Sequence, residues 1–222
     1  IRRPPRSTLS SSSAASDVYK RQQLIMTLRG MGILDAATLG ALEQVPRELF
    51  VPPALRHHSY ENASLPIAYN QTISQPYVIA RMTEALRLRG RELVLEIGCG
   101  SGYQAAILSY LCRRVYTMER LKPLLVGAEN RLRDLRISNV SFRLGDGSKG
   151  WPEAAPFDRI ILTCGCDKIP DILLQQLKIG GIMVAPEGQG KSQQLVVVTR
   201  HETGFERVLL MPVTFVPLIG GD

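Results

Sequence analysis

Three glycines at alternate positions, Gly98, Gly100 and Gly102, form the stretch of this chain best suited to hold a ligand. They follow a short run of branched apolar residues at 93–97, which is typical of a strand buried on both faces, and precede a helical pattern at 103–111. A strand, a glycine turn and a helix form the ligand crevice of an open α/β sheet. Glycine lets a ligand approach the backbone and tolerates positive φ. The predicted ligand-binding residues of this loop are Gly98, Cys99, Gly100, Ser101 and Gly102.

Two acidic residues and the glycine spacing narrow the choice of ligand. A dinucleotide fingerprint places its third glycine three residues after the second, where this chain has Tyr103. Glu96 lies inside the strand and suits a ligand with an ammonium group and no pyrophosphate, such as S-adenosylmethionine. Glu119 ends the next apolar run, about 20 residues after the loop, where an acid typically binds ribose hydroxyls. The loop alone favours a plain turn of some α/β protein, but together with both acids it indicates a methyl-donor site.

Two later strands also end in residues suited to this site. Asp146 and Gly147 follow the third predicted strand; an Asp-Gly pair is commonly a plain turn, but here an acid could accept a hydrogen bond from an adenine amino group. Thr163 ends the fourth predicted strand and is expected at the crevice. The residues after Thr163 lack the Asn/Asp-Pro-Pro-aromatic motif of methyltransferases that act on base amino groups. This difference counts against a nucleic-acid base as substrate.

Ser74 has two interpretations. It lies two residues before Pro76, which begins a helical stripe, so the sequence by itself favours a helix N-cap with proline in the first turn. The other interpretation is a role in catalysis. The residue pattern leaves both open.

The elements that must position these residues alternate along the chain. Strands are predicted at 93–97, 114–118, 140–144, 159–163, 181–185, 194–199 and 208–215, and helices at 103–111, 122–135 and 170–177. This alternation predicts a parallel sheet with helices on both faces. The last two strands are separated only by residues 201–206, which is too short for a helical crossover, so they are expected to be antiparallel. The predicted fold is α/β: a Rossmann-like class I methyltransferase with a mostly parallel seven-stranded sheet, an antiparallel C-terminal hairpin and an N-terminal helical extension.

The extension is predicted to contain helices at 23–31 and 35–45, the second capped by Asp35, then an extended segment at 46–53 and an irregular loop at 56–71. His57 and His58 lie in this loop. They could be metal ligands, but no matching third ligand is apparent, so solvated histidines are the better interpretation.

The composition is that of an ordinary globular protein, with 45% hydrophobic and 21% charged residues, and no apolar run approaches the roughly 18 needed to span a membrane. The four cysteines lack zinc-ligand spacing and are expected to be reduced in a cytoplasmic protein. Residues 1–22 carry five basic side chains against Asp17, a net of +4 out of +7. The remainder is only mildly basic, which argues against a nucleic-acid binder.

Residues 1–22 are rich in Ser, Pro and Arg and show no periodicity, so we expect them to be disordered and to be a non-native leader. An organelle transit peptide is the competing interpretation. The predicted organisation is therefore a leader at 1–22, a helical and substrate-loop extension at 23–90, and an S-adenosylmethionine-binding methyltransferase domain at 91–222.

From about residue 24 to 222 the chain resembles the protein-L-isoaspartate O-methyltransferases, a family of repair enzymes. The resemblance lies in Thr72-Ile73-Ser74-Gln75-Pro76-Tyr77, in 94–106 around the glycine loop, and in Gly145-Asp146-Gly147, Pro156-Phe157-Asp158, 176–181 and Phe215-Val216-Pro217-Leu218. The Ser74 segment and the Phe-Val-Pro-Leu motif are particular to the family, and they overturn the N-cap interpretation of Ser74. The chain departs from the family pattern at Glu61, 68–70, Cys99 and 164–167. The first two departures fall in the loop expected to cover the substrate, so they bear on peptide affinity.

The resemblance implies methyl transfer from S-adenosylmethionine to the α-carboxylate of L-isoaspartyl residues in damaged proteins and peptides, after which the ester collapses to a succinimide. A carboxylate with a pKa of about 3.5 is already ionised at pH 7, so no strong general base is needed. Ser74 is implied to orient this carboxylate, with Gln71 and Val216 as weaker substrate contacts. On the cofactor, Glu119 is implied for the ribose, Asp146 and Gly147 for the adenine, and 98–102 for the methionine portion.

The implied protein is a cytoplasmic monomer that binds neither nucleic acid nor membranes. Two alternatives stay open: a methyltransferase of the same fold that acts on a small-molecule carboxylate, and a non-catalytic module that binds S-adenosylmethionine.

Overall fold

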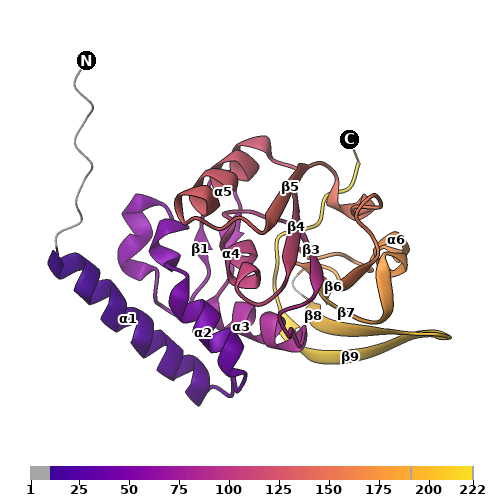
Figure 1. Cartoon of the computed structure of the whole chain (residues 1–222), viewed down its shortest axis with the longest axis horizontal. Coiled ribbons are helices and arrows are strands. Elements are labelled where there is room, and N and C mark those ends of the chain that lie inside the picture. The colour runs from indigo at the N-terminus through magenta and orange to yellow at the C-terminus, as the bar shows by residue number, and fades with distance from the viewer. Residues whose placement is uncertain (1–10, 191, 222) are drawn as a thin grey trace.

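A seven-stranded sheet forms the centre of the computed structural model, which describes residues 11–190 and 192–221 (Figure 1). The spatial order of its strands is β5-β4-β3-β6-β7-β8-β9. The strands are β3 (Leu93–Ile97), β4 (Arg114–Glu119), β5 (Val140–Leu144), β6 (Phe157–Leu162), β7 (Leu177–Glu187), β8 (Gln193–His201) and β9 (Gly204–Val213). Pairing is parallel from β5 through β7, whereas β8 is antiparallel to both β7 and β9. The prediction of a mostly parallel sheet with an antiparallel C-terminal hairpin is confirmed.

Alternate residues of the strands form two apolar layers, as expected for a sheet covered on both faces. Val94 and Val115 pack in a layer with helices α1 to α5, whereas Leu95 and Ile97 pack in the opposite layer with α6. The helices are α1 (Ser11–Gly30), α2 (Ala36–Gln44), α3 (Pro76–Ala85), α4 (Tyr103–Ser109), α5 (Lys122–Asp134) and α6 (Asp171–Gln175). Because neighbouring residues anchor opposite layers, the end of β3 is fixed from both sides.

Helix α1 lies along the outside of the helical layer and corrects one prediction (Figure 1). The prediction of disorder over 1–22 is wrong for residues 11–22, which are helical, while residues 1–10 lie outside the described part of the chain. Leu24 is the first residue of the helix that is described as buried, and the turns before it show no apolar periodicity in the sequence. These turns extend a helix that is already nucleated by the packing of its later residues, so adding them costs little free energy. A hydrogen bond from Arg21 to Tyr60 also holds them in place.

The segment between α2 and α3 also differs from expectation. The extended segment predicted at 46–53 contains the 3₁₀ helix η1 (Arg47–Leu49), and a second one, η2, spans Pro53–His58. Proline fixes φ near the value that a 3₁₀ helix needs, so the prolines of this segment are as compatible with a 3₁₀ helix as with an extended chain. The loop predicted at 56–71 contains the short strand β1 (Leu65–Pro66), which pairs with β2 (Thr72–Ile73).

The cap predicted at Asp35 is confirmed, since its Oδ2 accepts a hydrogen bond from Thr38 N at 2.9 Å.

None of the helices in the described part of the chain combines the length and the apolar character needed to cross a membrane.

Candidate active site

A cavity of about 630 Å³ opens at the carboxyl ends of β3, β4 and β6. Its walls come from the glycine loop, from the residues after β4, β5 and β6, and from two segments distant in sequence, 69–74 and 216–219. The predicted site residues that line it are Gln71, Ser74, Gly98, Cys99, Gly100, Ser101, Glu119, Gly147, Thr163 and Val216. Glu96, Gly102 and Asp146 were predicted for the same site but do not line the cavity.

The glycine loop has the conformation that its sequence requires. Gly98 has φ +97°, and a Cβ there would lie 2.6 Å from Thr163 Oγ1. Gly102 has φ +88°, and a Cβ would lie 2.9 Å from Ala128 Cβ in α5. Gly98 therefore lets β6 approach the loop, whereas Gly102 lets α4 begin close against α5. The second role explains why Gly102 is needed although it does not face the cavity.

Glu119 is held rigidly at the cavity wall. Its Oε2 accepts a hydrogen bond from Gly100 N at 2.8 Å and its Oε1 accepts one from Leu121 N at 3.0 Å. Each carboxylate oxygen can accept a further hydrogen bond, so the side chain remains able to bind two neighbouring hydroxyls. This is the arrangement that ribose recognition needs.

Glu96 lies beneath the loop with no exposed surface. Its Oε2 accepts a hydrogen bond from Thr117 Oγ1 at 2.5 Å, while Oε1 has no hydrogen-bond partner among the described residues. Burial raises the pKa of Glu96 to about 8; the Thr117 hydrogen bond opposes this shift and the charge of Glu119 adds to it. A buried carboxylate with one unpartnered oxygen is costly unless it is protonated or near a cation. With a pKa of about 8, Glu96 is mostly protonated at neutral pH, and a cation bound nearby would favour its ionised form.

Asp146 is engaged within the protein. Its Oδ1 accepts hydrogen bonds from the backbone N and the hydroxyl of Ser148 at 2.8 and 2.7 Å, and its Oδ2 accepts one from Gly221 N at 2.9 Å. Partial burial acts to raise the pKa of Asp146, but the hydrogen bonds from Ser148 and Gly221 outweigh it and lower the pKa. Gly147 does line the cavity, and a Cβ there would lie 2.4 Å from Ile97 Cγ2. Asp146 thus shapes the adenine end of the predicted site by fixing the backbone.

Thr163 supports the loop from β6. Its Oγ1 lies 3.0 Å from Ile97 O and also donates to Gly98 O. Because a hydroxyl has a single proton, these carbonyls occupy its donor capacity. Thr163 therefore stabilises the loop and offers a ligand only the acceptor capacity of its oxygen.

Ser74 also lines the cavity and lies directly after β2. The residue that caps α3 is Gln75, with no side-chain cap hydrogen bond, so the N-cap interpretation of Ser74 is wrong. The Ser74 carbonyl accepts a hydrogen bond from Arg47 Nη2 at 2.9 Å. Its hydroxyl has no hydrogen-bond partner among the described residues, which leaves it available to a bound substrate.

Arg47 is a residue near the site that the sequence interpretation missed. It is fully buried, and its guanidinium lies 4.9 Å from the ring centroid of Tyr103, which lines the cavity. Its Nε and Nη1 have no hydrogen-bond partner in the described part of the chain. Burial lowers the pKa of Arg47, although not enough to neutralise a guanidinium. The signal that could have revealed it is an arginine set between the buried apolar residues Val45 and Phe50.

The remaining candidates for chemistry are not arranged for it. The rings of His57 and His58 are 3.8 Å apart and His58 pairs with Glu61, but the described residues contain no group of three or more potential metal ligands. Burial raises the pKa of the Cys99 and Cys164 thiols, so both stay protonated and are poor nucleophiles.

Comparisons with known proteins agree with this geometry. Residues 19–222 match the family model described as Protein-L-isoaspartate(D-aspartate) O-methyltransferase (PCMT). A protein-L-isoaspartate O-methyltransferase from Parvibaculum lavamentivorans is 53% identical over 202 residues, covering 90% of this chain and 91% of the relative. One from Maricaulis maris is 52% identical over 200 residues, covering 90% of this chain and 94% of the relative.

Solved structures show the same fold. A protein-L-isoaspartate O-methyltransferase superposes with a TM-score of 0.81 at 29% identity, over 90% of this chain and 66% of the other. A Plasmodium falciparum beta-aspartate methyltransferase (PCMT) in complex with S-adenosyl-L-homocysteine gives a TM-score of 0.78 at 22% identity, over 90% and 98% of the two chains. The family match covers the cavity and all the elements around it. On this evidence the chain belongs to the protein-L-isoaspartate O-methyltransferase family.

Proposed function

We propose that this protein repairs damaged proteins by methylating the α-carboxylate of L-isoaspartyl residues, with Ser74 as the residue that orients this carboxylate. As a member of its family, the protein is an enzyme that uses S-adenosylmethionine. The observation that carries the residue-level proposal is that Ser74 lines the same cavity as the glycine loop and that its hydroxyl has no hydrogen-bond partner among the described residues. A hydrogen-bond donor for the substrate and the residues proposed to bind the cofactor thus line the same cavity.

The residues of the cavity fit the methyl donor. Glu119 has spare acceptor capacity for ribose hydroxyls, and the backbone of 98–101 provides a surface free of bulky side chains. The ionised form of the buried Glu96 would be stabilised by a cation nearby. Gly147 and the apolar Leu218 form a wall suited to a flat aromatic base. When bound, S-adenosylmethionine supplies an electrophilic methyl group on a sulfonium.

The residues of the protein then have two tasks: to position the substrate carboxylate and to exclude water from the cavity. Ser74 donates a hydrogen bond to one carboxylate oxygen, which leaves the other oxygen as the nucleophile. Arg47, a buried cation that donates to the Ser74 carbonyl, fixes the backbone of this residue and makes the local potential favourable for an anion. No general base is required, because the carboxylate is ionised at neutral pH. Orientation of the reactants is therefore the main contribution to rate.

We further propose that Gln71 and Val216, which line the cavity, contact the peptide. We assign residues 23–90 to the substrate-binding extension and 91–222 to the methyltransferase domain. The mild basicity of 23–222 supports a protein that works on peptides and not on nucleic acid. We also propose that the protein is a cytoplasmic monomer and does not bind membranes.

Methyl transfer to an isoaspartyl peptide, measured beside an aspartyl peptide of otherwise identical sequence, tests the function. The expected result is label on the isoaspartyl peptide alone. Equal labelling of the two peptides would show that the isomer is not recognised. Binding of S-adenosyl-L-homocysteine without labelling of either peptide would point instead to a small-molecule carboxylate substrate or to a non-catalytic binding module.

A further inference from the structure

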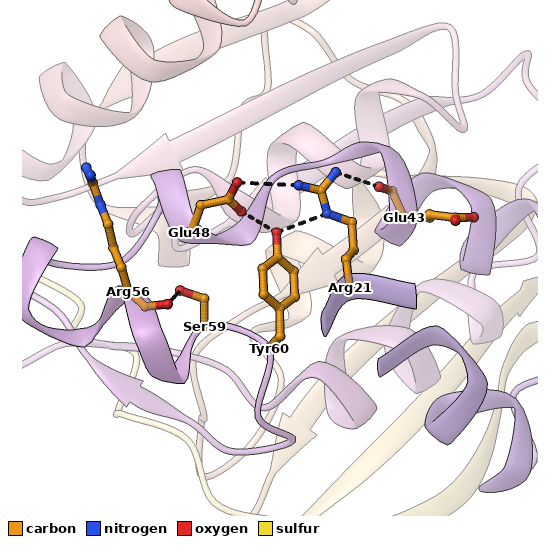
Figure 2. A network of polar contacts seen from close by, with 6 residues as sticks. All are labelled: Arg21, Glu43, Glu48, Arg56, Ser59 and Tyr60. Atoms are coloured by element: carbon orange, nitrogen blue, oxygen red, sulfur yellow. Dashed lines mark hydrogen bonds and ion pairs between the residues drawn. The ribbon is translucent and has the colours of Figure 1, made fainter. Parts of the chain in front are cut away.

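Three polar side chains from separate parts of the N-terminal region meet in one network, which Figure 2 shows. Arg21 of α1 donates from Nε to Tyr60 Oη at 3.0 Å and from Nη2 to Glu48 Oε1 at 3.4 Å. Tyr60 donates its hydroxyl proton to Glu48 Oε2. Arg21 Nη1 also donates to the carbonyl of Glu43, near the end of α2, at 3.0 Å. One arginine of α1 thus joins α2, η1 and the loop that carries Tyr60.

The network is sheltered from water. The side chains of Arg21 and Glu48 are 17% and 14% exposed, and Tyr60 is buried. Hydrogen bonds between charged groups in such a setting are stronger than those of a surface ion pair. Burial, together with the hydrogen bond to Glu48, raises the pKa of Tyr60 well above its ordinary value, so the phenol stays protonated. The Tyr60 hydroxyl therefore keeps the proton that it donates to Glu48.

The network continues from Tyr60 to the segment around Ser74. Asn62, two residues after Tyr60, accepts a hydrogen bond from Tyr77 N on its Oδ1 at 3.0 Å. Its carbonyl accepts one from Gln75 Nε2 at 2.9 Å. Gln75 and Tyr77 follow Ser74 closely, so Asn62 holds the chain immediately after the serine.

A second route to Ser74 begins at Glu48. The residue before it, Arg47, donates to the Ser74 carbonyl at 2.9 Å and to the Ala63 carbonyl at 3.4 Å. Two connections therefore lead from the Arg21 network to the serine, one through the loop and one through η1. None of these side chains except Ser74 itself touches the cavity.

We propose that Arg21 is a positioning residue for substrate binding, which acts through Glu48 and Tyr60 on the segment that carries Ser74, so that α1 contributes to substrate binding through this one side chain. This inference rests on the proposed role of Ser74. It assigns a function to a residue that the sequence places at the margin of a low-complexity segment. Its action is on peptide binding, because the hydrogen bonds of both connections end on the segment that carries Ser74.

The test uses the full chain with Arg21→Met, and Arg29→Met as the control, because Arg29 is an exposed basic residue of the same helix. Initial rates are measured against isoaspartyl peptide concentration, and binding of S-adenosyl-L-homocysteine is measured by calorimetry. Arg21→Met is expected to raise KM for the peptide about fivefold, the effect of one lost hydrogen bond. The kcat, the Kd for S-adenosyl-L-homocysteine and the KM of Arg29→Met are expected to stay within about twofold of wild type. A lower melting temperature with unchanged KM would overturn the inference, since it would show a purely structural role.

Tyr60→Phe and Arg21→Lys supply an independent readout if Arg21→Met does not fold. Tyr60→Phe is expected to raise KM, and its combination with an Arg21 variant is expected to raise KM no further than the larger single effect, since both break the same connection. Fully multiplicative effects would overturn the inference. If the wild type is active and Ser74→Ala is impaired, but both Arg21 variants have a normal KM, the inference about Arg21 is wrong. The proposed function would then still hold. An inactive wild type would defeat both.

Discussion

Glu119 carries the most specific residue-level prediction on the cofactor side. In Glu119→Gln, one carboxylate oxygen becomes an amide NH₂ that must face either Gly100 N or Leu121 N, both of which are donors. Loss of hydrogen bonds to a charged group costs about 1.5–3 kcal/mol each, which corresponds to roughly 10- to 100-fold weaker binding. Calorimetry with S-adenosyl-L-homocysteine measures this change. Glu129→Gln, on the exposed face of α5, serves as the control, and equal affinity of the two variants would remove Glu119 from the ribose site.

Ser74→Ala tests the substrate side. The variant is expected to lower kcat/KM for an isoaspartyl peptide by about tenfold or more, the value of one hydrogen bond to a charged group. Affinity for S-adenosyl-L-homocysteine is expected to stay within about twofold, because the proposed cofactor contacts come from the glycine loop, Glu119 and Gly147. Ser138→Ala, at an exposed position, controls for the loss of a hydroxyl. Detection of a methylated or acylated Ser74 during turnover would contradict its orienting role.

Glu96 predicts a pH dependence of stability. Its pKa is raised from 4.5 in the unfolded chain to about 8 in the folded protein, chiefly by burial. Between these values the folded state binds more protons than the unfolded state, so the contribution of Glu96 to stability falls as the pH rises from about 4.5 to about 8, by at most about 1.4 kcal/mol per pH unit. Glu96→Gln lacks this dependence, so its free energy of unfolding relative to wild type is expected to rise over this range. Urea unfolding at pH 5 and pH 8 measures the difference, with Glu129→Gln as the control; a pH-independent difference would refute the assignment.

At the scale of elements, the junction between the glycine loop and α4 depends on Gly102. Alanine there would adopt an unfavourable φ of +88° and place its Cβ 2.9 Å from Ala128 Cβ. Backbone strain and overpacking each cost about 1–3 kcal/mol, so Gly102→Ala is expected to destabilise the protein by about 2–4 kcal/mol. The matched control is Gly40→Ala in α2, where a Cβ meets nothing within 4 Å, and a gain of about 0.5–1 kcal/mol is expected. Chemical denaturation checks both signs, and a neutral Gly102→Ala would show that α4 and α5 can separate without cost.

The central strands were predictable from sequence because they are buried on both faces, and a run such as Leu93–Ile97, apolar except for Glu96, depends little on context. The rule that parallel strands present their carboxyl ends at one edge then brought Glu119, Thr163 and the glycine loop together. Helix α1 was predictable only from Leu24 onward, because its earlier turns are held by Arg21, a contact with residues 22 to 39 positions away. The burial of Arg47 depends on the same kind of distant contact. No local pattern encodes such contacts.

The placement of Asp146 shows a second limit. Its position after β5 was predicted, but its oxygens accept hydrogen bonds from Ser148 and from Gly221, which lies 75 residues further along the chain. A motif identifies the residue type at a strand end and cannot tell whether its side chain points at a ligand or at another segment. Ser74 is the reverse case: local rules favoured a cap, and the fold places the serine in the cavity instead.

At the scale of the whole molecule, one cavity joins the two halves of the chain, so a ligand that fills it should stabilise the entire fold. S-adenosyl-L-homocysteine at a hundred times its Kd adds about 2.7 kcal/mol to the free energy of unfolding, which corresponds to a rise in melting temperature of roughly 5–10 °C for a chain of this size. Thermal unfolding with and without the ligand measures this rise. At the same ligand concentration Glu119→Gln is expected to show a smaller rise, and equal rises would mean that the ligand binds elsewhere.

The walls of that cavity extend in sequence from Tyr69 to Ile219. During synthesis, therefore, a growing chain on the ribosome has its glycine turn and both acids long before it has the segment at 216–219 that closes the pocket. The cavity therefore has all of its walls only after translation has passed this segment. The complete pocket is accordingly a late product of the synthesis of each new molecule.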